Sequence, residues 1–121
     1  MDAFFGMECM QINISEFGDS AKKIVLTGKL DIAGAQTIEL PLATVAGSRT
    51  NIVVDMIGVD FIASIGIRHL LLAARTVARA SRKLILLDPN PSVTDVLVTA
   101  GLGDILPIVR SEDEARAAFT P

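Results

Sequence analysis

The chain has 121 residues, of which 50% are hydrophobic and 21% charged, so it can bury a core and does not have the composition of a disordered segment. Its formal net charge is −3, and no run of Lys or Arg could follow a phosphate backbone, which argues against a nucleic-acid partner. We expect a single domain over residues 1–121.

The first residues give no indication of export or of membrane insertion. They lack the basic start and apolar stretch of a secretory signal, and no apolar run approaches the ~20 residues of a membrane span. Cys9 is the only cysteine, so no internal disulfide can form. We therefore expect a cytoplasmic protein.

The N-terminal part predicts a β-hairpin followed by a helix. Apolar and polar residues alternate over residues 9–16, and a turn at Phe17–Ser20 leads into a second strand at Lys22–Leu26. From Asp31 the apolar spacing becomes helical and could end at Gly47. Pro41 lies inside that pattern and should kink or break the helix.

The middle of the chain predicts a central strand and an amphipathic helix. Ile52–Val54 is a short apolar run expected to end at Asp55. Ser64–Ser81 has the most regular helical period in the chain, with an apolar face and a basic face. The basic face comprises Arg68, Arg75, Arg79 and Arg82, which could be a solvated surface or a docking site.

The C-terminal part predicts two more strands and two more helices. Leu84–Leu87 is a strand, Ser92–Ala100 a helix, and Ile105–Val109 an edge strand interrupted by Pro107. A capping box at Ser111–Glu114 opens a last helix through Phe119. The predicted fold class is α/β, a mixed sheet of about five strands with four helices in the order β-β-α-β-α-β-α-β-α.

The sequence offers little for catalysis. Cys9 and His69 have no partner at metal-ligand spacing, and no glycine-rich phosphate loop is present, so we expect no metal and no cofactor. Ser64 and His69 are five residues apart, which sets them roughly 140° apart around one helix and prevents them from forming a hydrolytic pair. Binding of a protein partner is the better interpretation.

Ser64 is the most informative residue, because it begins the amphipathic helix. Its side chain is placed to cap that helix, and a phosphate on it would meet unpaired N–H groups at the positive end of the helix dipole. Gly66 should keep the helix start uncrowded, so that another protein's active site could approach the hydroxyl. Ser64 could therefore both cap the helix and accept a phosphate, because the two roles are compatible.

Two motifs resemble those of the STAS-domain family, in particular its anti-sigma-factor antagonists. Leu26–Asp31 is similar to the family's Leu-Thr-Gly-x-Leu-Asp motif, and Ala63–Ile67 to its Asp-Ser-Ser/Thr-Gly-Leu motif, which places the phosphorylated serine at Ser64. The resemblance covers nearly the whole chain and implies a STAS-like fold without enzymatic activity.

The resemblance also implies partner switching. The unmodified antagonist would bind a serine-kinase anti-sigma factor, phosphorylation would release it, and a metal-dependent serine phosphatase would reset it. The implied partner-binding residues are Asp31, Ala63, Ser64, Ile65, Gly66, Arg68 and Leu72. A homodimer is left open.

Several alternatives remain open at this point. Asp31 could orient the Ser64 hydroxyl, discourage its phosphorylated state or cap the first helix. Leu72 could face the partner or pack under a loop. Ala63 and Ile65 replace the acidic and hydroxyl residues that often flank the family's serine. A STAS module serving as an unphosphorylated subunit of a transporter or signalling scaffold is the alternative function. A response-regulator receiver is disfavoured, because Asp55 lacks the acidic pair that would hold Mg²⁺.

Overall fold

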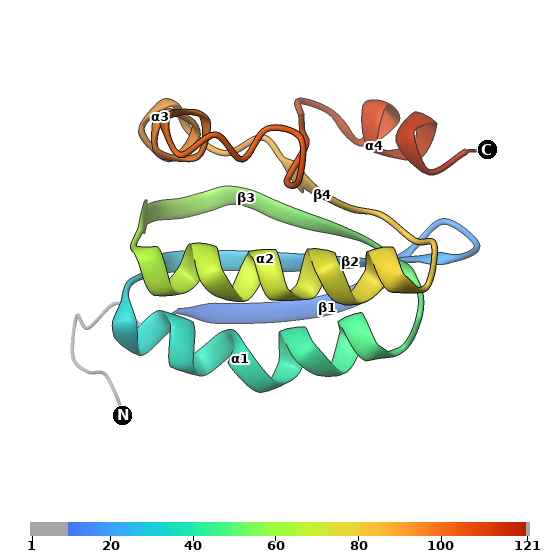
Figure 1. The fold of residues 1–121 in the computed structure, drawn as a ribbon, viewed down its shortest axis with the longest axis horizontal. Helices are drawn as coiled ribbons and strands as arrows, with labels where there is room; N and C mark the ends of the chain where they lie inside the picture. Colours follow the sequence, from blue (N-terminus) through green and yellow to red (C-terminus); the bar gives the residue numbers. More distant parts are fainter. Residues whose placement is uncertain (1–9, 121) are drawn as a thin grey trace.

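The computed structural model describes residues 10–120 (Figure 1). Its elements follow one another as β1 (Gln11–Phe17), β2 (Ala21–Leu30), α1 (Ile32–Gly47), β3 (Asn51–Ile62), α2 (Ser64–Arg79), β4 (Leu84–Leu87), α3 (Pro91–Thr99), β5 (Ile108–Val109) and α4 (Glu112–Phe119). The predicted order and fold class are confirmed. Cys9, at the start of the predicted first strand, lies outside the described residues.

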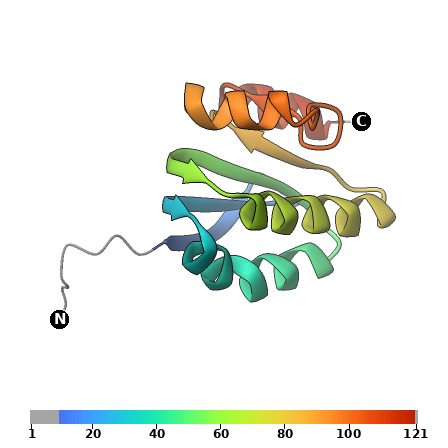
Figure 2. The same ribbon diagram turned by 60° about the vertical axis from the view of Figure 1, so that its left-hand side comes forward.

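The five strands form one sheet in chain order, β1-β2-β3-β4-β5. β1 and β2 form the predicted antiparallel hairpin, and the remaining pairs are parallel. Helices α1 and α2 lie side by side along the strands, with α3 and α4 beyond β4 (Figures 1 and 2). Because α1 and α2 each follow a parallel strand, both helices begin at the same edge of the sheet.

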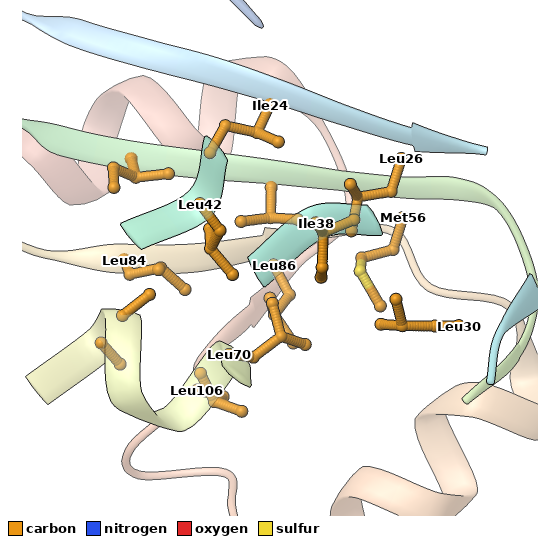
Figure 3. Packing of buried hydrophobic residues seen from close by; sticks show 14 of the residues in the cluster. Ile24, Leu26, Leu30, Ile38, Leu42, Met56, Leu70, Leu84, Leu86 and Leu106 are labelled. Atoms are coloured by element: carbon orange, nitrogen blue, oxygen red, sulfur yellow. The ribbon is translucent and has the colours of Figure 1, made fainter. Parts of the chain in front are cut away.

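The main core lies between the sheet and the helices α1 and α2 (Figure 3). It is almost entirely aliphatic, with side chains of α1, α2, β2, β3 and β4 meeting in its centre, where α3 and Leu106 complete it. A smaller cluster on the other face packs Phe17, Val53, Ile85 and Leu87 against Ala115 of α4. The two clusters bury both faces of β4 and of β3 over residues 51–56; for β3, the apolar run Ile52–Val54 predicted this.

The central strand is longer than predicted. β3 continues from Asp55 to Ile62, because β2 also extends to Leu30 and pairs with it along its whole length. Two register shifts interrupt this pairing, between Val25 and Thr27 and between Gly28 and Lys29. Such irregularities obscure the apolar alternation that would mark a strand in the sequence.

Two proline predictions had different outcomes. α1 runs unbroken through Pro41, since buried residues on both sides of it, including Ile38 and Leu42, hold the helix against the sheet. The last strand is confirmed as an edge strand but is only two residues long, beginning directly after Pro107. Within residues 10–120, no helix has both the length and the apolar character needed to cross a membrane.

Candidate functional site

The candidate site is the sheet edge where α1 and α2 begin. Leu30 and Ile62, the last residues of β2 and β3, are paired neighbours in the parallel register. The next residues along each strand, Asp31 and Ala63, are the N-caps of α1 and α2. The backbone N–H of Ala63 donates to the carbonyl oxygen of Leu30 at 2.9 Å. The two predicted motifs therefore meet at one place.

Ser64 is the first residue of α2 and is exposed. The prediction that it caps the helix is wrong: the N-cap is Ala63, and no side chain caps the helix start. The carbonyl of Ala63 accepts hydrogen bonds from the N–H groups of Gly66 and Ile67 at 3.0 and 3.1 Å. In residues 10–120, neither the hydroxyl nor the N–H of Ser64 makes a hydrogen bond, so the hydroxyl is not committed to holding the fold.

Gly66 has a different role from the one predicted. It is buried, and a Cβ atom built there would lie 2.6 Å from Cγ and 2.9 Å from Cδ2 of Leu30. The absent side chain therefore lets α2 pack onto the end of β2, which corrects the expectation that Gly66 leaves room for a visiting protein. Gly34 does the same for α1 against the Lys29 carbonyl, a role that no sequence pattern indicated.

Of the predicted roles of Asp31, the structure shows the capping of α1. Its Oδ1 atom accepts a hydrogen bond from the N–H of Gly34 at 2.8 Å, which satisfies one of the unpaired donors in the first turn of α1. Its carboxylate makes no hydrogen bond to Ser64. Asp31 thus lies at the same edge as Ser64 but is engaged by its own helix.

The remaining predicted residues follow the outer face of α2. Ala63 and Ile65 are partly exposed, and Arg68 is exposed. Leu72 is 46% exposed, so it is not packed under a loop. It lines a cleft of about 150 Å³ between α1 and α2, together with Glu39, Leu42, Ala43, His69, Ala73 and Thr76. The side chain of His69 is partly buried and lines one side of this cleft.

Sequence reasoning missed three exposed apolar side chains on α1 and β3. Ile32 opens α1 and is 69% exposed, while Ile57 and Phe61 of β3 are 60% and 49% exposed. Phe61 belongs to the segment that leads into α2, so its position in the sequence could have indicated an exposed role near Ser64. Ile32 does not fit the apolar spacing of the buried face of α1, and this could have indicated that it is exposed. Ile32 and Phe61 belong to the segments that meet at the candidate site, and exposed apolar residues of this kind are typical of a protein-binding surface.

A charged cluster lies on the other face of the sheet. Lys23 Nζ is 2.5 Å from Glu112 Oε2 of α4 and 3.7 Å from Oδ2 of buried Asp55. The hydrogen bond to Glu112 raises the pKa of Lys23, and the same bond lowers the pKa of Glu112. Asp55, which stands where a receiver domain has its phosphorylated aspartate, thus forms an ion pair with Lys23.

Comparison with known proteins agrees with this geometry. The family model of the STAS domain matches residues 14–115. Over 95 residues the chain is 33% identical to "Putative anti-sigma factor antagonist BtrV" of Bordetella bronchiseptica, an alignment that covers 78% of this chain and 82% of that protein.

Solved structures share the fold. An anti-sigma factor antagonist from Mycobacterium paratuberculosis matches with a TM-score of 0.82 at 18% identity, over 91% of this chain and 93% of that chain. The Bacillus cell fate determinant SpoIIAA in its phosphorylated form matches with a TM-score of 0.70 at 21% identity, over 89% of this chain and 99% of that chain. The family match and the similarity to BtrV show that this chain belongs to the STAS domain family.

Proposed function

We propose that this protein is an anti-sigma-factor antagonist that works by partner switching. Its unmodified form binds a serine-kinase anti-sigma factor, and phosphorylation of Ser64 releases it. The observation that carries the proposal is an exposed hydroxyl at the first residue of α2, on a surface with exposed apolar side chains. The similarity to BtrV and the phosphorylated state of SpoIIAA support it.

A phosphate on Ser64 would be compatible with the fold. It would stand at the positive end of α2, where the first N–H groups of a helix lack intrahelical partners. Ser64 takes no part in capping, and the start of α2 is held instead by Ala63 and Leu30. Modification would therefore change the surface and leave the packing beneath it intact.

The same phosphate would oppose the binding of a partner. It adds about −1.5 to −2 charges close to Ile65, which is partly exposed. An apolar contact surface that closes over such a group must remove water from it, which is costly. Removal by a metal-dependent serine phosphatase would restore the binding form.

The test is to incubate the protein with its cognate serine-kinase anti-sigma factor and ATP, and to map the modified residue by mass spectrometry. We expect one phosphate, on Ser64, and none on the Ser64→Ala variant. Ser92→Ala is the matched control, because Ser92 is also an exposed serine in the first turn of a helix, α3. Phosphate on another residue would refute the role of Ser64. No phosphate with the cognate kinase would refute the proposal and favour an unphosphorylated subunit of a transporter or signalling scaffold.

A further inference from the structure

We infer that the outer face of α2 is a docking surface for an acidic protein surface, and that this surface starts at Ser64. Three exposed arginines, Arg68, Arg75 and Arg79, carry it and are called here the arginine stripe. The inference deepens the proposed function and rests on it for the identity of the partner, which is the anti-sigma factor bound at Ser64.

The arginine stripe and Ser64 lie on one side of the helix. At 100° per residue, Arg75, Arg68, Arg79 and Leu72 all fall within about 80° of Ser64 around the axis of α2. The stripe extends about 22 Å from Ser64 to Arg79, given 1.5 Å per residue. A partner that covers Ser64 and lies along α2 would contact all three arginines.

The stripe is a local excess of positive charge on an acidic protein. Five of the 11 Lys and Arg residues lie between Ser64 and Lys83, a segment without Asp or Glu, which leaves six to face 14 acidic residues elsewhere. None of the ion pairs within the described part of the chain involves an arginine of the stripe. The arginines of the stripe are therefore available to pair with carboxylates of another molecule.

The chemistry of the stripe favours a protein over other polyanions. Arginine pairs with carboxylates in a planar, two-pronged geometry and is enriched in protein interfaces. Exposed Leu72 and the cleft beside it add an apolar contact between the charges. α2 has no Phe, Tyr or Trp on which a base could stack. Its apolar face is buried against the sheet, so it cannot insert into a membrane surface.

This arrangement gives phosphorylation a second effect. A phosphate on Ser64 would place about −1.5 to −2 charges at one end of the stripe, where it would oppose the attraction for an acidic partner. Release would then be strongest at low ionic strength, because exposed charges more than about 10 Å apart are screened at ~0.1 M salt.

The first test needs no natural partner. The protein is titrated with a glutamate-rich peptide and followed by amide NMR, with duplex DNA and anionic lipid vesicles as comparators. We expect peptide-induced shifts along the outer face of α2, weakened by salt and lost in the Arg68→Gln/Arg75→Gln variant. Gln keeps helix propensity, so folding should be unaffected. Lys22→Gln/Arg49→Gln, which removes the same charge away from α2, should bind like the parent protein.

The second test uses the anti-sigma factor itself. Electrostatic steering accelerates association, so the Arg68→Gln/Arg75→Gln variant should associate about tenfold more slowly at low salt, with a weaker salt dependence. If the parent protein binds the kinase and the variant associates at the same rate, the docking role of the arginine stripe is refuted and the proposed function stands. If the glutamate-rich peptide binds at the stripe but the kinase does not bind the protein, the proposed function is refuted and the docking role of the stripe stands. Shifts caused only by DNA or vesicles would also overturn the stripe.

Discussion

The side chain of Ser64 contributes no contact that the fold needs, which makes its substitution informative. Ser64→Ala should fold and bind the anti-sigma factor like the parent protein, since the cap of α2 is the backbone of Ala63. Ser64→Asp should bind about tenfold more weakly, because it adds a charge to the contact surface. Calorimetry would measure both. Ser92→Asp on α3 controls for added charge, and equal affinities of the two Ser64 variants would contradict the charge argument.

Gly66 offers a matched test of packing at the same site. Gly66→Ala would force a methyl group against Leu30 and should lower the free energy of unfolding by about 1–3 kcal/mol. Gly47→Ala, at the end of α1 with nothing within 4 Å of its added Cβ, should be neutral or stabilise by about 0.5–1 kcal/mol. Urea denaturation compares the two. Similar changes in the free energy of unfolding for both variants would mean that the contact with Leu30 does not prevent a side chain at position 66.

These residues show how far the sequence could predict the site. The position of Ser64 at the start of a helix followed from apolar periodicity, which is a local property. The burial of Gly66 could not be predicted, because it depends on the side chain of Leu30, 36 residues earlier in the chain. A glycine that permits close packing and one that leaves a surface open look the same in a sequence.

At the level of elements, α1 and α2 begin by different means. α1 has a side-chain cap, so Asp31→Ala should lower the free energy of unfolding by about 1 kcal/mol. Asp31→Asn should retain most of it, because the amide oxygen can accept the bond from Gly34. Thermal and urea unfolding would measure this. A large loss in Asp31→Asn would show that the charge of Asp31 matters beyond capping.

The lengths of elements were less predictable than their order. The order followed from hydrophobic period and turn residues, and the apolar run Ile52–Val54 of β3 marked the centre of the sheet. The extension of β3 to Ile62 was not visible, because Gly58 and Asp60 interrupt its apolar pattern and only pairing with β2 keeps this part extended. That extension places Ala63 beside Asp31, so the missed feature is what assembles the site.

For the whole molecule, the contact between Lys23 and Glu112 joins α4 to the sheet across 89 positions in the sequence. Glu112 has a pKa lowered from its ordinary 4.5 by the hydrogen bond from Lys23, so its contribution to stability is present above pH 4.5 and is lost as the pH falls through the lowered value. Lys23 has a pKa raised from 10.5 by the same bond, so its contribution is present below pH 10.5 and is lost as the pH rises through the raised value.

This predicts a pH-dependent effect of Glu112→Gln. The variant should be less stable at neutral pH by at most about 1 kcal/mol, since the Glu112 side chain is 44% exposed and solvent screens the pair. The difference should shrink below pH 4.5. Urea denaturation across pH, repeated in a Lys23→Gln background, measures it. A difference that persists in that background would mean that Lys23 is not the cause.

The two-residue length of β5 has a consequence for how the molecule behaves among its own copies. An edge strand exposes backbone donors and acceptors that another chain can pair with, and a long edge invites stacking into aggregates. Here the edge offers only Ile108–Val109, and Pro107 directly before it has no N–H to give. Growth of the sheet at the β5 edge is therefore discouraged by the short length of the strand and by the proline that precedes it.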